Sequence, residues 1–162
     1  MSFFNALIFF LFVSLIPNKA LGEDKKELGI KKGELAPDFE IKTVTGEDFK
    51  LSDHYKKQPV VLVFYRGGWC PYCNTQLRRI QQKVVPKIKG AGLVAISVDK
   101  VDEGTKTKKE QRLSFTLLSN PNAEVLVKYN VAFKVPQKLV DKYKSEYQID
   151  LEAASGQNHH TI

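Results

Sequence analysis

Residues 64–73 read Phe-Tyr-Arg-Gly-Gly-Trp-Cys-Pro-Tyr-Cys and contain both cysteines of the 162-residue chain. The apolar run 60–65 leads into this stretch, and apolar residues at helical spacing follow it. Proline fits the first position inside a helix, where its missing N–H costs nothing. Pro71 therefore predicts Cys70 as the N-cap and Cys73 as the third helical residue. The stretch indicates a strand that delivers two thiols to the first turn of a helix.

This placement favours redox chemistry. The first-turn N–H groups of a helix have no intrahelical acceptor, and the helix dipole stabilises negative charge there. Both effects lower the pKa of a thiol, and the thiolate is the reactive form. Cys73 lies within one turn, so it could attack a mixed disulfide or a sulfenic acid on Cys70 and close a Cys70–Cys73 bond. We expect Cys70 to be the nucleophile, because an N-cap is commonly more exposed than the third helical position.

Other uses of the two cysteines fit less well. A structural disulfide that closes so short a loop would remove little chain entropy. A zinc site needs about four ligands, and only His54, His159 and His160 could join the cysteines, so no metal is expected. Two inert buried thiols fit poorly with a polar helix start. The chain has no GxGxxG motif and no P-loop, so no nucleotide cofactor is expected either.

The first 22 residues differ from the rest. Residues 6–17 are almost entirely apolar, and Ala20-Leu21-Gly22 supplies small residues before a cleavage point. We interpret residues 1–22 as a secretory signal peptide and predict an exported protein, periplasmic or secreted. The apolar run is short for a membrane span, so no stable span is expected after cleavage, although an uncleaved anchor is an alternative.

Residues 23–162 are predicted to form one domain, since 43% of the chain is hydrophobic. The formal net charge is +7, but the cations are spread along the chain and no aromatic residues alternate with them. Nucleic acid is therefore not an expected partner.

Periodicity indicates an α/β order. Residues 60–65 and 93–98 predict strands buried on both faces, the first of them central in its sheet. The intervening pattern, residues 71–89, predicts a helix that Pro86 kinks, and the three segments make a parallel, right-handed βαβ unit. The remaining elements are a hairpin at 39–51 with a helical turn after it, an exposed helix at 102–112, a short strand near 115–118, a helix capped by Asn122, a helix at 137–147 and a loop at 153–157.

Four segments together resemble the alkyl hydroperoxide reductase/thiol-specific antioxidant group of peroxiredoxin-like proteins over roughly residues 33–160. They are Gly-Glu-Leu-Ala-Pro-Asp-Phe at 33–39, the stretch 64–73, Leu-Val-Ala-Ile-Ser-Val at 93–98, and Phe-Thr-Leu-Leu-Ser-Asn-Pro at 115–121. The resemblance implies a thioredoxin-like α/β fold, with a central mixed sheet flanked by helices. It also implies antioxidant, thiol-dependent reduction of peroxides or protein disulfides, with a thiol reductant protein of thioredoxin type as partner.

Two family patterns overlap on the cysteines. The peroxiredoxin pattern P-x-x-x-T-x-x-C places its reactive cysteine at Cys73, with Arg66 and Cys70 in place of the Pro and Thr. The thioredoxin pattern W-C-x-x-C makes Cys70 the attacking thiol and Cys73 the resolving one. Trp69, Pro71 and Tyr72 would line the substrate approach in either case.

In relatives the chain continues beyond the region of His-His-Thr-Ile into further strands and a final helix, with an Arg that polarises the peroxide. This sequence stops at Ile162, so we expect a sheet that is incomplete at the carboxyl terminus, with one edge of a central strand bare. Arg66 is the nearby cation that could replace the family's Arg, or it is a surface residue. The rival function is a non-catalytic redoxin-like interaction module that a partner or a further chain completes.

Overall fold

The computed structural model describes residues 28–151, 153 and 160–161 of the chain. The predicted signal peptide at 1–22, and most of the loop predicted at 153–157, lie outside the described residues. The elements, in chain order, are β1 (Glu40–Lys42), β2 (Asp48–Lys50), α1 (Leu51–Tyr55), β3 (Val60–Phe64), α2 (Pro71–Lys83), β4 (Gly92–Ser97), α3 (Val101–Glu110), β5 (Thr116–Ser119), α4 (Glu124–Lys128), β6 (Phe133–Lys134), α5 (Gln137–Tyr147) and β7 (His160–Thr161). No helix within the described ranges has the length and apolar character to cross a membrane.

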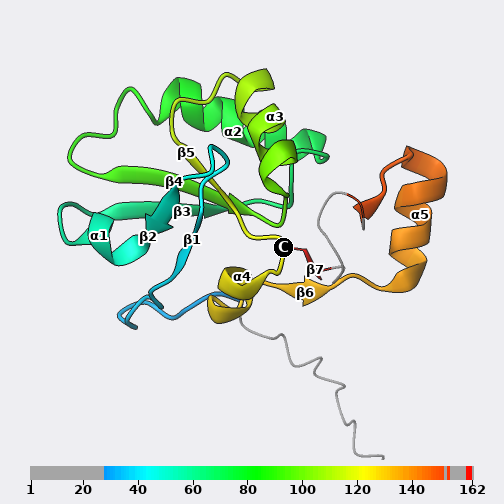
Figure 1. Ribbon diagram of the computed structural model, residues 1–162, viewed down its shortest axis with the longest axis horizontal. Coiled ribbons are helices and arrows are strands. Elements are labelled where there is room, and N and C mark those ends of the chain that lie inside the picture. Colours follow the sequence, from blue (N-terminus) through cyan, green and yellow to red (C-terminus); the bar gives the residue numbers. More distant parts are fainter. Residues whose placement is uncertain (1–27, 152, 154–159, 162) are drawn as a thin grey trace, which may run out of the picture.

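A parallel sheet with the strand order β3-β4-β5 forms the centre of the molecule (Figure 1). Its register pairs Val63 with Ala95, and Ala95 with Leu117. Helix α2 connects β3 to β4, and helix α3 connects β4 to β5. The parallel βαβ unit predicted from periodicity is confirmed, and the three short apolar runs explain it, because parallel strands need cover on both faces.

Two hydrophobic clusters cover the two faces of this sheet. Val94, Ile96 and Val98 pack into one cluster, with the β1–β2 hairpin and α4. Ala95 belongs to the other cluster, which includes Leu77 of α2 and both cysteines. Successive strand residues point to opposite faces, so β4 is buried on both sides as predicted.

The position of strand β3 in the sheet differs from the prediction. The sequence pattern placed it in the centre, buried on both faces, but it lies at the edge of the three-stranded sheet, and Val61 is 42% exposed. Among the described strands, β3 pairs with β4 alone. An apolar, β-branched run predicts a strand, whereas the position of that strand in the sheet depends on which segments pack beside it.

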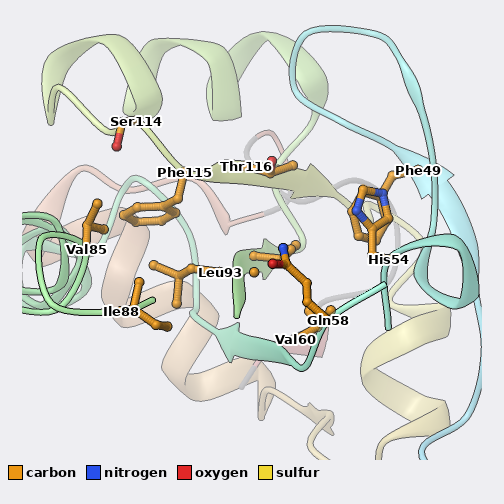
Figure 2. Close-up of a pocket in the computed structure, with 12 residues that line it drawn as sticks. Phe49, His54, Gln58, Val60, Val85, Ile88, Leu93, Ser114, Phe115 and Thr116 are labelled. Carbon is orange, nitrogen blue, oxygen red and sulfur yellow. The ribbon is translucent and has the colours of Figure 1, made fainter. Parts of the chain in front are cut away.

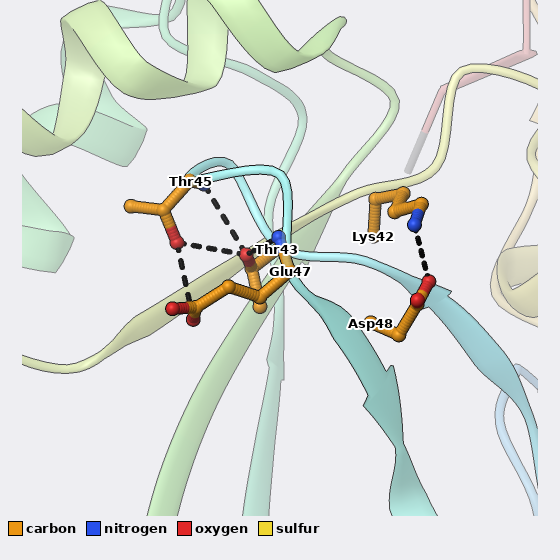
Figure 3. A network of polar contacts seen from close by, with 5 residues as sticks. All are labelled: Lys42, Thr43, Thr45, Glu47 and Asp48. Atoms are coloured by element: carbon orange, nitrogen blue, oxygen red, sulfur yellow. Dashed lines mark hydrogen bonds and ion pairs between the residues drawn. The ribbon is translucent and has the colours of Figure 1, made fainter.

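The predicted hairpin at 39–51 is confirmed as the antiparallel pair β1–β2, and the predicted helical turn is α1. Asp38 joins the two, because its carboxylate accepts the N–H groups of Phe39 at 3.0 Å and Ser52 at 2.9 Å. The hydroxyl of Thr43 accepts two further N–H groups inside the hairpin turn (Figure 3). A bridge from Thr43 to Leu118 attaches the hairpin to β5.

Two helix predictions need correction in detail. Helix α2 ends at Lys83 and does not continue to Lys89, because Pro86 has no N–H to donate and disfavours the helical conformation at the one residue before it. The cap of α4 comes from Asn120, whose side-chain oxygen accepts the N–H of Val125 at 3.0 Å, and not from the exposed Asn122. The strand predicted near 115–118 is β5.

The predicted helices 102–112 and 137–147 are α3 and α5. Val140 of α5 is buried with Val135 and Leu151, and this small cluster packs against Trp69. Phe133 is 45% exposed on β6. Figure 1 shows α5 beyond one end of the sheet, where it follows β6.

Candidate active site

The two cysteines lie at the start of α2, as predicted. Cys70 is the N-cap in an extended backbone conformation, and Pro71 is the first helical residue. The Cys70 sulfur accepts the backbone N–H of Cys73 at 3.3 Å. This is the capping interaction that a side-chain acceptor makes at a helix start. Both cysteines are free thiols in the structure.

Arg66 lies directly against the cap. Its Nη2 donates to the Cys70 sulfur at 2.9 Å, and the guanidinium carbon lies 5.2 Å from the centre of the Trp69 ring. Its Nη1 donates to the Tyr143 hydroxyl at 3.3 Å. The structure therefore places Arg66 at the sulfur and not on the open surface. Burial alone would lower the pKa of Arg66, but hydrogen bonds with Cys73 and Cys70 raise it, so the guanidinium stays charged.

The surroundings shift the pKa values of the two thiols in opposite directions. Burial acts to raise the pKa of Cys70, but hydrogen bonds from the Cys73 thiol, the Cys73 N–H and Arg66 outweigh it, and the pKa is lowered. Burial raises the pKa of the Cys73 thiol, and its hydrogen bond to Cys70 raises it further. The arrangement can hold a thiolate on Cys70 while Cys73 stays protonated.

Exposure does not follow the prediction. Cys70 was expected to be the more accessible thiol, yet it is 0% exposed and Cys73 is 8% exposed. The Cys70 side chain folds back over the first turn to accept the N–H, and Trp69 packs against the same cluster. What distinguishes Cys70 is therefore its charge stabilisation and not its access to solvent.

Asp99 fixes the loop before the cysteines. Its carboxylate accepts the Gly68 N–H at 2.8 Å and the Ser97 hydroxyl at 3.0 Å, and the residue is 1% exposed. Burial raises the pKa of Asp99 to about 6, although these two donors oppose the shift. Sequence reasoning missed this residue. The available clue was its position directly after a buried parallel strand, at the carboxyl edge where sites commonly form.

Two glycines allow the loop before the cysteines to pack closely against buried side chains. Gly67 has a φ of +147°, and a Cβ there would lie 2.6 Å from Asp99 Oδ1 and 2.6 Å from Trp69 Nε1. A Cβ on Gly68 would overlap the Thr107 hydroxyl. Glycine is required at both positions because the backbone itself packs against the buried side chains.

A pocket of about 340 Å³ opens next to Trp69 and Pro71, the residues on either side of Cys70. One wall holds the four predicted residues Arg66, Trp69, Pro71 and Tyr72, and the pocket brings them together. The opposite wall is formed by α5 and the residues after it, and sequence reasoning missed it; its members are Leu139, Lys142, Tyr143, Tyr147 and Ile149. The two tyrosines are one helical turn apart, which was the only clue in the sequence.

Figure 2 shows a second cleft, of about 400 Å³. Val60, Leu93 and Thr116 line it, near the amino ends of the three parallel strands, together with His54 stacked on Phe49. The cysteines follow the carboxyl end of β3, where sites in parallel sheets usually lie. In the part of the chain that the structure describes, no three His, Cys, Asp or Glu side chains gather as a metal site.

The chain is similar to proteins of known family and fold. A model of the AhpC/TSA family matches residues 32–152. The thioredoxin-like protein YneN of Bacillus subtilis is 25% identical, with 79% of this chain and 84% of that protein covered. The peroxiredoxin Bcp of Escherichia coli is 30% identical, with 63% of this chain and 65% of that protein covered, so the match spans just under two thirds of that relative.

Two solved structures have the same fold. The peroxidoxin BcpB of Mycobacterium tuberculosis superposes with a TM-score of 0.60 at 27% identity, over 67% of this chain and 70% of that chain. A secreted disulfide oxidoreductase of the same organism, described as homologous to DsbE of E. coli, has a TM-score of 0.50 at 27% identity, over 57% of this chain and 68% of that chain.

Proposed function

The chain belongs to the AhpC/TSA family of peroxiredoxin-like thiol oxidoreductases, and we propose that Cys70 and Cys73 are the redox-active pair of its site. Cys70 is the nucleophile and Cys73 is the resolving thiol. The observation that carries the assignment is the 2.9 Å contact between Arg66 Nη2 and the Cys70 sulfur. A cation and a helix start at one sulfur favour its thiolate form.

With a peroxide as substrate, the Cys70 thiolate attacks one peroxide oxygen and the O–O bond breaks. Cys70 is oxidised to the sulfenic acid, and the alkoxide or hydroxide takes up a proton and leaves as an alcohol or water. With a disulfide as substrate, the same thiolate attacks one sulfur, and the other sulfur leaves as a thiolate.

Cys73 completes either reaction. It loses its proton and attacks the Cys70 sulfur, which forms the Cys70–Cys73 disulfide and releases water or the second substrate thiol. The pair is then a two-electron oxidised centre. A thiol reductant protein of thioredoxin type returns it to the dithiol by disulfide exchange.

Mass-resolved trapping after a short exposure to substrate tests this assignment. We expect Cys73→Ser to accumulate a sulfenic acid on Cys70 with hydrogen peroxide, and a mixed disulfide through Cys70 with a small aromatic disulfide. Cys70→Ser should accumulate neither species. Sulfenic acid that appears on Cys73 of Cys70→Ser instead would assign the attack to Cys73, as in the peroxiredoxin pattern, and would overturn this proposal.

The rival interpretation, a non-catalytic redoxin-like module, is not favoured, since the matched relatives carry the names of peroxiredoxins and disulfide oxidoreductases. A variant pair that forms no trapped species with either substrate would restore it. We further propose export, on the basis of residues 1–22. Intact-mass measurement of the protein from a periplasmic or secreted fraction should show a chain that begins at Glu23; an uncut amino terminus would contradict this.

A further inference from the structure

Tyr143 contacts the candidate site from a different element. It lies on α5, 77 positions from Arg66 in sequence, and its hydroxyl accepts a hydrogen bond from Nη1 of Arg66 at 3.3 Å. Its ring meets the Trp69 ring edge to face at 5.4 Å and the Tyr147 ring at 5.6 Å. The Tyr143 side chain is therefore held by aromatic packing on two sides while its polar end touches the guanidinium.

The two ends of the guanidinium have different partners. Nη2 points to the Cys70 sulfur and Nη1 to the Tyr143 hydroxyl, while Trp69 lies against the guanidinium. The side chain also hydrogen-bonds with Cys73. Arginine has a long side chain that loses considerable rotamer freedom when it is fixed. Because its planar fork is rigid, an acceptor at one nitrogen orients the other nitrogen.

We propose that Tyr143 is a positioning residue that holds the Arg66 guanidinium on the Cys70 sulfur, so that α5 helps to keep this thiol ionised. The inference rests on the proposed role of Cys70 as nucleophile. Tyr143 acts through Arg66 and does not itself touch the sulfur in this arrangement. The helix that walls the pocket thus also tunes the nucleophile, and a substrate that moves α5 would change the reactivity of Cys70.

The test is the ionisation of Cys70 in the reduced protein, measured by the ultraviolet absorbance of the thiolate as pH changes. All variants are made in a Cys73→Ser background, so that a single thiol titrates. Tyr143→Phe removes the hydroxyl and keeps the ring that packs on Trp69. We expect the Cys70 pKa to rise by roughly half a unit to one unit, with an unchanged midpoint of thermal unfolding.

Tyr147→Phe is the matched control. It is a tyrosine of the same helix and the same pocket, with its ring against Tyr143, and it is 56% exposed. The Cys70 pKa should stay within experimental error in this variant. An equal rise in Tyr147→Phe and Tyr143→Phe would indicate a general effect of polarity in the pocket and would overturn the proposal.

The double variant Arg66→Gln/Tyr143→Phe shows whether Tyr143 acts on Cys70 through Arg66 or independently of it. If Tyr143 acts through Arg66, the double variant has the same Cys70 pKa as Arg66→Gln alone. Additive rises in pKa would mean that Tyr143 acts on the sulfur by another route. This readout needs no turnover, so a failure of the proposed catalytic function and a failure of this inference give different results.

Discussion

At the residue scale, the site gives different pKa values to two chemically identical side chains that lie three positions apart in sequence. Cys70 receives hydrogen bonds from the Cys73 thiol, the Cys73 N–H and Arg66. Cys73 is buried and donates a hydrogen bond from its own thiol to Cys70, and these two effects outweigh its hydrogen bonds with Arg66. The two pKa values therefore move in opposite directions. Such a pair suits sequential chemistry, because one sulfur attacks first and the other acts only after it loses its proton.

Asp99 yields a prediction on the pH dependence of stability. Burial raises the pKa of this carboxyl from 3.8 to about 6, so the folded state holds a proton that the unfolded state has released. Its contribution to the free energy of unfolding therefore falls as pH rises from about 4 to about 6. At about 1.4 kcal/mol per pKa unit, the loss is of the order of 3 kcal/mol at most.

Asp99→Asn keeps an acceptor for the Gly68 N–H and removes the titration. Urea unfolding at several pH values should show that the variant gains stability relative to the wild type as pH rises through this window, and that the difference is constant above and below it. Asp141→Asn, on the exposed surface of α5, is the control. A difference between Asp99→Asn and wild type that does not vary with pH would contradict the assignment.

At the element scale, α4 shows how local chemistry selects a boundary. Ala123 precedes the helix in a left-handed conformation, with φ of +55°, and offers no side-chain cap. The buried Asn120, three residues earlier, reaches the N–H of Val125 instead. The side chain of the exposed Asn122 donates a hydrogen bond to the carboxylate of Glu124.

We therefore expect Asn120→Ala to lower the free energy of unfolding by about 1–2 kcal/mol, as the loss of a helix cap commonly does. Asn122→Ala should change it by less than about 0.5 kcal/mol, as is typical of exposed positions. Chemical denaturation of both variants provides the measurement. Equal losses in the two variants would return the capping role to Asn122.

The sequence predicts helices and strands better than it predicts which segments pack beside them. The N-cap at Cys70 and the helix at 137–147 could be predicted because proline geometry and apolar periodicity are local properties. The edge position of β3, the burial of Cys70 and the choice of Asn120 over Asn122 could not, because each depends on tertiary packing. The sequence pattern placed Tyr143 in a helix but did not predict its contact with Arg66. That contact joins segments far apart in the chain.

At the scale of the whole molecule, burial is uneven. Strand β4 has four buried residues and two covered faces, whereas Val140 is the one buried residue of α5. Elements with few buried apolar contacts open locally at low free-energy cost. Cys70 is 0% exposed, and α5 lines the pocket next to it, so local opening of α5 would also loosen the contact between Tyr143 and Arg66.

Hydrogen exchange tests this uneven stability. Amides of α5 should exchange at least about tenfold faster than those of Ala95 and Ile96 in β4, when rates are corrected for sequence. Helix α2, with Cys73 and Leu77 buried, should lie between them. Protection of α5 as strong as that of β4 would contradict this uneven stability.

The most direct test of the central claim is an NMR titration of the reduced wild-type protein with isotope-labelled cysteine. The claim is that Cys70 and not Cys73 carries the thiolate. The two groups titrate as a coupled pair, so the relevant result is which Cβ resonance changes in the first step. The account predicts that Cys70 changes first, at a pH below the ordinary thiol pKa of about 8.5, and that Cys73 changes above it. A first step on Cys73, or a first step at the pH of an ordinary thiol, would contradict it.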